Sequence, residues 1–447
     1  MTIGEHISGA VQLYDFTQRQ YVTVAALSDS NVIAAGTRRQ CCANGAFEIG
    51  GCFAGTLSLT CRLHGLTRYA VKGARIILRR WFDGESLTGD NAPIEGIFWV
   101  TDVQRYGEIF TLSGQDAMGW ADVSSYNHTT AEDGLSAGVY GFGELLAQLH
   151  AGGATLEAWM LYTVQLANIL AYRQTGIADL LTWRDYDESA NGGVSYCNKF
   201  IWTDHDVEDR SQPAYFWLYT ADGVYKDDSP RSFLRWAAQA AGGFITVTKD
   251  GTLTLRQFAQ PSLGDAVVEM ADMELEGCEV ADYRLQLYNT AVVFDDVPDV
   301  SCAGGGVPVS GSEAPYRIFV EGNPIMNGFH GYQTDRAGQY RLSTVWGLAM
   351  SMYHYGADRN VIARPFRVKV HTTDRYELGQ RIRFPDWKDA GSAAAQDFYS
   401  VITAVNWTFR AGTELSCGGE DSRVMADCVR ATKADKAVRE LRSRFKA

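Results

Sequence analysis

The stretch from Ser229 to Phe258 constrains the fold more than any other part of this chain, because it predicts a capped helix followed by a tight hairpin. Ser229 is a favourable N-cap, and Pro230 at the first helical position has its backbone φ already fixed near the helical value. A glycine pair at 242–243 supplies the left-handed residue that ends a helix. Apolar residues then alternate on both sides of a Lys249–Gly251 turn. We expect a half-buried module that needs a partner surface.

Composition sets the outer limits. The chain has 447 residues, which is too long for one hydrophobic core and predicts about two to four domains. A hydrophobic content of 46% and 45 glycines favour a folded protein rich in strands and turns. The nine cysteines form no CxxC pair and have no histidine at zinc-ligand spacing, so we expect free buried thiols and no metal. A net charge of −13 argues against a surface that binds duplex nucleic acid.

No apolar run is long enough to span a bilayer, and the N-terminus lacks the charged and apolar regions of a signal peptide. We therefore expect a chain that stays in a cytoplasm until something exports it.

Period-two alternation predicts a strand at Thr56–Leu63. Further strand-like runs, separated by glycine and proline, follow at Arg75–Phe82, Ile97–Val103 and Glu108–Leu112. Strands at this spacing favour a small closed barrel or a sandwich. The pattern turns helical after Ser113, and a long helix over Leu156–Arg173 is apolar most of the way round, so we expect it to be buried or at an interface. Residues 182–226 read as an irregular insertion.

Strands return after the hairpin, with a second long helix over Thr334–Tyr355. The predicted strands are Glu269–Glu279, Leu285–Phe294, Pro365–Val370, Gln380–Phe384, Phe398–Ala404 and Asn406–Arg410. The expected fold class is α+β dominated by strands. Its expected parts are a first barrel at 1–117, a helical and irregular insertion at 118–228, the helix and hairpin at 229–262, a second barrel at 263–420 and a basic helix at 421–447.

The C-terminal segment from residue 421 is rich in basic residues and helix formers. Apolar residues there recur with heptad spacing, which permits a short parallel coiled coil. The candidate oligomerisation residues are Val424, Ala431, Val438, Leu441 and Phe445. A solvated helix that packs on its own domain explains the same pattern equally well.

The sequence contains no motif that carries catalytic chemistry: HExxH, GxSxG, the Walker motif and GxGxxG are all absent. The acidic run Asp204–Asp209 does not have the spacing of an EF-hand and reads as a solvated loop. None of the eight histidines stands in a nucleophile motif, so each is expected to be a surface or structural histidine. We expect no catalytic residues, no cofactor and no enzymatic activity.

Five stretches, in this order, resemble one family, the baseplate or tail-tip hub proteins of tailed phages and related injection systems. The segment LSGQDAMGW at Leu112–Trp120 is similar to a family motif that usually has an aromatic residue where this chain has Gln115. In the last of the five stretches, Gln380 stands where the family commonly has Asp. The five stretches are Leu57–Leu78, Leu112–Trp120, Leu234–Phe258, Ile318–Gly328 and Phe366–Gly418.

The resemblance implies two homologous barrels per chain, which form a pseudo-sixfold ring when the chain trimerises. Such a ring adapts a hexameric tail tube to a threefold spike, and its acidic lumen passes DNA without specific binding. The implied partners are a second and third copy of the chain, a tail tube or distal tail protein, a spike or tail-tip protein and a tape measure protein. The implied location is the virion tail, assembled in the host cytoplasm.

Two alternatives remain open. The chain could be a tail-associated cell-wall hydrolase with a non-standard site, or the hub of a phage-derived bacteriocin or contractile injection system.

Overall fold

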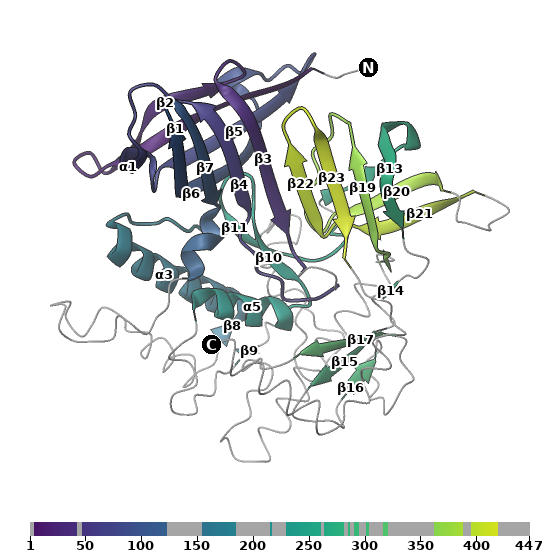
Figure 1. The fold of residues 1–447 in the computed structure, drawn as a ribbon. Helices are drawn as coiled ribbons and strands as arrows, with labels where there is room; N and C mark the ends of the chain where they lie inside the picture. The colour runs from purple at the N-terminus through teal and green to yellow at the C-terminus, as the bar shows by residue number, and fades with distance from the viewer. Residues whose placement is uncertain are drawn as a thin grey trace.

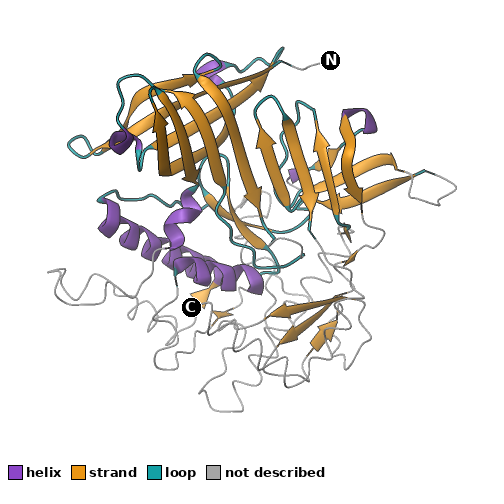
Figure 2. Ribbon diagram, viewed as in Figure 1, coloured by secondary structure: helices purple, strands orange, loops and turns teal. Residues whose placement is uncertain are grey.

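A computed structural model of the chain shows a fold dominated by strands, with the two longest described helices lying below the large sheet (Figure 2). It confirms the expected β-dominated α+β class. The structure describes residues 4–42, 47–122, 154–184, 215–216, 229–260, 263–280, 285–286, 290–294, 301–303, 316–320, 362–387 and 395–418. The helix expected over Thr334–Tyr355, the acidic run 204–209 and the C-terminal candidate residues lie outside this part of the chain.

One antiparallel sheet of eleven strands runs through both halves of the molecule in the order β13-β19-β23-β22-β3-β4-β7-β6-β5-β1-β2 (Figure 1). Seven of its strands come from the N-terminal part of the chain: β1 (Glu5–Asp15), β2 (Gln20–Ser28), β3 (Val32–Gln40), β4 (Thr56–Arg62), β5 (Arg75–Phe82), β6 (Ile94–Tyr106) and β7 (Ile109–Gln115). The other four are β13 (Met273–Val280), β19 (Phe366–Val370), β22 (Ala404–Thr408) and β23 (Gly412–Cys417).

Strands β1 to β7 surround a single hydrophobic core to which every one of them contributes buried residues. The alternation predicted for β4 is confirmed, since every second side chain in this strand is buried. Every second side chain of β5 is also buried, although Arg80 occupies one of these positions. The two flanking strands of this group, β2 and β3, are consecutive in sequence, but no strand pairing joins them among the described residues. The sheet therefore curls around its core without the hydrogen bonds that would close a barrel.

The second half has its own aromatic core. A three-stranded sheet of β12 (Asp265–Val267), β20 (Arg381–Trp387) and β21 (Gln396–Val401) accompanies the C-terminal strands of the large sheet. Phe384 stacks on Phe398 with ring centroids 5.0 Å apart, and Phe366 packs edge-on to Phe384 at 5.3 Å. Such contacts add to the free energy that area burial already supplies.

The two halves are joined by a strand pair. Strand β22 lies antiparallel to β3, with Ala404 opposite Gln40 and Thr408 opposite Gly36. Trp407 of β22 is 1% exposed and belongs to the core of the first half. The halves that the sequence presents as separate modules therefore share both a sheet and a core.

The helix and hairpin predicted at Ser229–Phe258 are confirmed as α5 (Pro230–Ala240), β10 (Phe244–Val247) and β11 (Leu253–Arg256). Gly242 takes the expected left-handed conformation at φ 66°. Ser229 stands at the N-cap position, but its side chain makes no capping hydrogen bond. Every described residue of the two strands is buried.

Two short segments flank this hairpin, one beside each of its strands. Cys52 bridges to Ile245, and Trp183 bridges to Leu253. Helix α3 (Leu156–Thr175), predicted as a buried or interface helix, packs with α5 and with the 3₁₀ turn η2 (Ala117–Asp122) below the sheet (Figure 1).

The remaining elements are short. They are α1 (Arg68–Val71), η1 (Gly89–Asn91), β8 (Ala154–Thr155), β9 (Tyr215–Phe216), η6 (Met270–Asp272), β14 (Leu285–Gln286), β15 (Thr290–Phe294), β16 (Ser301–Ala303), β17 (Tyr316–Val320) and β18 (Ile362–Ala363). The single strand expected over Leu285–Phe294 is wrong, because β14 and β15 belong to different sheets. Strand β21 ends at Val401 rather than at Ala404, since Ala404 already begins β22.

Candidate functional site

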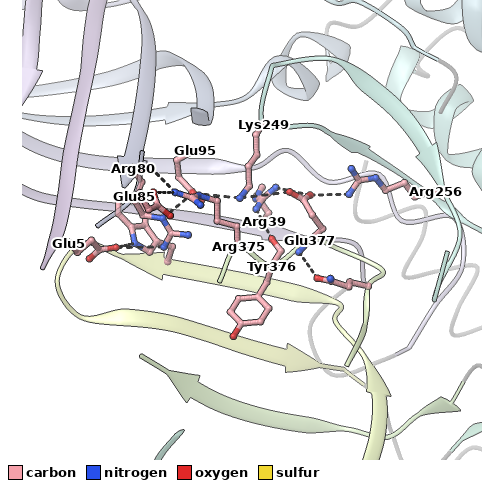
Figure 3. A network of polar contacts seen from close by, with 12 residues as sticks. Glu5, Arg39, Arg80, Glu85, Glu95, Lys249, Arg256, Arg375, Tyr376 and Glu377 are labelled. Carbon is pink, nitrogen blue, oxygen red and sulfur yellow. Dashed lines mark hydrogen bonds and ion pairs between the residues drawn. The ribbon is translucent and has the colours of Figure 1, made fainter. Parts of the chain in front are cut away.

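A network of buried charges lies where the first half, the hairpin and the second half meet (Figure 3). Its carboxylates and cations come from strands and turns that are far apart in the sequence. The members are Glu5, Arg39, Arg80, Glu85, Glu95, Lys249, Arg256, Arg375 and Glu377.

Glu377 of the second half is the centre of the network. Its carboxylate lies 3.0 Å from Nη1 of Arg256, 3.5 Å from Nη1 of Arg39 and 3.7 Å from Nζ of Lys249. Burial alone would raise the pKa of Glu377, but these three cations outweigh it and lower the pKa to about 2. One carboxylate thus holds cations from β3, from the hairpin turn and from β11.

Lys249 at the hairpin turn links the two halves. Its ammonium is 3.6 Å from Oε2 of Glu95 in the first half and 3.7 Å from Oε1 of Glu377 in the second. Burial lowers the pKa of Lys249, and the two carboxylates oppose that shift. Burial would raise the pKa of Glu95, yet Lys249 and Arg80 bring it below its ordinary value. Each charge is therefore kept by its partners.

Arg80 extends the network toward the start of the chain. It lies 3.3 Å from Glu95 and 3.5 Å from Glu5, and its guanidinium sits 5.2 Å from the ring centroid of Trp407. The Nε1–H of Trp407 donates to Glu5 over 2.7 Å, and the backbone N–H of Arg410 donates to the same carboxylate. Glu5 therefore holds two groups of the second half.

Arg375 and Arg39 make the remaining contacts between the halves. Nη2 of Arg375 donates to Glu85 at 2.7 Å and to the carbonyl of Arg80 at 3.1 Å. Nη2 of Arg39 donates to the carbonyl of Tyr376 at 3.3 Å. A carboxylate–cation network of this kind holds a geometry, because breaking one partner leaves an uncompensated buried charge. It contains no serine, cysteine or histidine that could act as a nucleophile or base.

A second buried carboxylate, Asp116, shapes the turn after β7. Its side chain accepts from the backbone N–H of Gly55 at 2.7 Å and from that of Met118 at 3.0 Å. Burial raises the pKa of Asp116 to about 7, although both hydrogen bonds favour the ionised form. Ala117 and Met118 beside it are fully buried. The QDAM sequence is thus a buried structural turn.

Solved structures with a similar course of the chain are tail proteins. A tail protein from Neisseria meningitidis MC58 is 11% identical with a TM-score of 0.46, and covers 93% of this chain and 97% of its own. The 43 kDa tail protein of prophage MuSo2 from Shewanella oneidensis is 10% identical with a TM-score of 0.42, and covers 94% and 99%. No protein family matches the sequence, and no curated protein does.

A third solved structure is the E. coli c3393 protein, a component of the type VI secretion system that is itself described as similar to the T4 tail proteins gp27 and gp5. It is 8% identical with a TM-score of 0.35, and covers 88% of this chain and 74% of its own. The resemblance predicted from the sequence is found again here. Because these TM-scores are all below 0.5, the function proposed for this chain rests on its own residues.

The structure also bears on the cysteines, on metal ligands and on membrane-spanning helices. Six cysteines (41, 42, 52, 61, 278 and 417) are free thiols, and all except Cys278 are buried, which confirms the expectation for them. No three His, Cys, Asp or Glu side chains gather as a metal site within the described residues. In the same part of the chain, no helix is long and apolar enough to cross a membrane.

The charge network is not among the features predicted from the sequence. A lysine in a Lys-Asp-Gly turn is typical of an exposed hairpin tip. The one available signal is Arg256, a charged residue at a position where β11 is otherwise apolar or threonine.

Proposed function

We propose that this protein is a structural hub of a phage tail tip or baseplate, and that its charge network fixes two strand-rich modules as one body. The observation that carries the proposal is the junction itself. Pairing of β3 with β22, insertion of Trp407 into the first core and the contacts of Glu377 all act across the same boundary. A rigid adaptor between a tube and a spike needs such a boundary.

The segments that carry the family resemblance support this role, because their most distinctive residues are buried parts of the fold. Asp116 holds the turn after β7. Gly379, next to Gln380, has φ 78°, and a Cβ atom there would lie 2.7 Å from the ring of Phe244. The resemblance therefore concerns architecture, and none of these residues is placed for chemistry.

The finer parts of the proposal follow from the resemblance. Three copies would form a pseudo-sixfold ring of paired strand-rich modules that matches a hexameric tube and a threefold spike. The ring would surround an acidic channel for DNA, and the C-terminal segment with Val424, Ala431, Val438, Leu441 and Phe445 would bundle the three chains. The partners would be tail tube, spike and tape measure proteins in the virion.

The test is co-expression of the full chain with the tail tube and spike proteins encoded beside it, followed by native mass spectrometry. We expect one complex with three copies of this chain. A chain that stays monomeric with both partners present, and that binds neither, would contradict the hub assignment. A variant with Val438, Leu441 and Phe445 all changed to Ser tests the C-terminal bundle separately, and it should still bind the tube protein.

A cell-wall hydrolase is the second candidate considered. Zymography on peptidoglycan separates the two functions, because a structural hub leaves the substrate uncleared.

A further inference from the structure

His6 at the start of β1 lies between two carboxylates. Its Nδ1 is 2.6 Å from Oδ2 of Asp29, in the turn between β2 and β3. Its Nε2 is 2.9 Å from Oδ1 of Asp83, the residue that follows β5. The ring also stacks on Trp81, its partner across the β1–β5 pair, with centroids 5.3 Å apart and an interplanar angle of 17°.

The two contacts define the protonation state of this imidazole. A neutral imidazole has one N–H and one bare nitrogen, and a bare nitrogen repels a carboxylate. Both contacts are hydrogen bonds only when both nitrogens carry a proton. The two carboxylates correspondingly raise the pKa of His6 above 6.5, with Asp29 contributing most.

The neighbouring charges do not compete for this ring. Glu5 and Arg80 flank the pair in sequence, but their side chains are 8% and 4% exposed and bind each other inside the network. The side chain of His6 is 34% exposed. Asp29 and Asp83 are the titratable groups that face the ring, one from the β2–β3 turn and one from the residues after β5.

The contacts among His6, Asp29 and Asp83 hold a part of the chain that also contacts the second half. Glu5, next to His6, binds Trp407 and Arg410. Glu85, two residues after Asp83, accepts from Arg375 at 2.7 Å. The backbone N–H of Asp83 also donates to the carbonyl of Gly4 at 2.9 Å. Movement of Asp83 would therefore move an anchor of the junction.

We propose that His6, Asp29 and Asp83 form a proton-dependent latch on the junction between the two halves. When the imidazolium loses a proton to water, one nitrogen is left bare and its carboxylate contact breaks. Asp83 is the arm that is released, because its side chain is 72% exposed whereas Asp29 also accepts from the backbone N–H of Ile7 at 2.8 Å. Release of Asp83 loosens residues 83–85 and with them the Glu85–Arg375 contact.

The direction follows from linkage. The folded-state pKa of His6 is raised, so the latch stabilises the protein fully below its unfolded-state pKa and is lost as the pH rises through the folded-state value. The latch can be tested on the purified chain, without tube or spike proteins. Its failure would therefore leave the proposed tail function untouched.

The test measures amide hydrogen exchange of residues 83–85, corrected for the intrinsic rate, from about pH 6 to about pH 9, a range that begins just below the ordinary histidine pKa and extends well above it. We expect protection to fall by roughly tenfold as the pH rises, the effect of losing one charge-assisted hydrogen bond. H6Q should show low protection without a transition. H64Q is the matched control, because His64 has one carboxylate partner, Glu108, and a 71% exposed side chain, and it should behave as the wild type.

D83N gives a second measurement that remains available if H6Q does not fold. With one carboxylate removed, the pKa of His6 should decrease. The exchange transition reports this pKa even if H6Q does not fold. Where H6Q folds, the NMR signal that it lacks identifies His6 and reports the pKa directly. A transition that persists in H6Q, an unchanged transition in D83N, or exchange that stays constant while His6 titrates would each overturn the latch.

Discussion

Replacing Glu377 by Gln is the most direct test of the junction. The change keeps the size of the side chain and removes its charge. It leaves Arg39, Lys249 and Arg256, which lie 3.5, 3.7 and 3.0 Å from the carboxylate, without their shared anion. The three cations then repel each other in a largely buried site, which is costly because the local dielectric is low.

The magnitude follows from the pKa. Glu377 titrates at about 2 in the folded protein against an ordinary value of 4.5. At about 1.4 kcal/mol per unit, that difference contributes about 3 kcal/mol to the free energy of unfolding at neutral pH. Loss of one partner of a buried ion pair typically costs about 3–5 kcal/mol. Because the Glu377 side chain is 24% exposed, we expect the lower end of this range.

The cost should depend on pH in one direction. The folded-state pKa is lowered, so the contribution is complete above an unfolded-state pKa of about 4.5 and disappears as the pH falls toward about 2. The stability difference between the wild type and E377Q should therefore shrink on acidification. Asp116 and His6 titrate in both proteins and cancel from the difference.

The assay is urea unfolding followed by tryptophan fluorescence at several pH values. E108Q serves as the control, because Glu108 pairs with His64 at the surface and its side chain is 57% exposed; it should change stability by about 1 kcal/mol or less. An E377Q protein as stable as E108Q at neutral pH, or a difference that does not shrink in acid, would refute the role given to the network.

Three further predictions use other buried positions. Because burial raises the pKa of Asp116 to about 7, the wild type should lose stability relative to D116N as the pH rises from about 4 to about 7, which thermal unfolding across that range will check. Gly379 and Gly84 both have positive φ, but of the two only Gly379 lacks room for a Cβ atom. In urea unfolding, G84A should cost about 1–2 kcal/mol through backbone strain, and G379A should cost about 1–3 kcal/mol more. Equal costs would contradict the close contact between Gly379 and Phe244. W407F removes the hydrogen bond to Glu5 and should cost about 1–3 kcal/mol, measured as a shift of the unfolding midpoint without a change in its slope.

The parts of the fold that local chemistry determines could be predicted. The helix and hairpin after Ser229 depend on Pro230, Gly242 and a turn glycine, all of which act on their neighbours in sequence. The run predicted at Arg75–Phe82 has the same ends as strand β5, because it is rich in β-branched and aromatic residues and is bounded by Gly73 and Gly84.

Strands β1 to β3 carry no such signal. Strand β1 has a register shift between Val11 and Gln12 that breaks its alternation, and most residues of β2 are exposed. No strand before Thr56 was predicted for this reason.

The junction could not be predicted because it depends on pairing between remote segments. Nothing near Gln40 in the sequence specifies Ala404 as its partner. Lys249 and Arg256 belong to a stretch whose pattern predicts only a half-buried module, yet they supply two of the cations around Glu377. A charged residue is buried only where partners from other elements meet it, and local periodicity does not report them.

The pairing of β3 with β22 also fixes when the protein can finish folding during synthesis. Strand β22 and Trp407, which complete the edge and core of the first half, emerge from the ribosome only after the more than 360 residues that separate Gln40 from Ala404 (404 − 40 = 364) have been synthesised. At about 5–20 residues per second, the nascent chain waits on the order of tens of seconds with this edge unpaired. An open edge recruits other strands. High-level expression should therefore lose material to aggregation during translation, and a lower expression level or an added holdase chaperone should recover it.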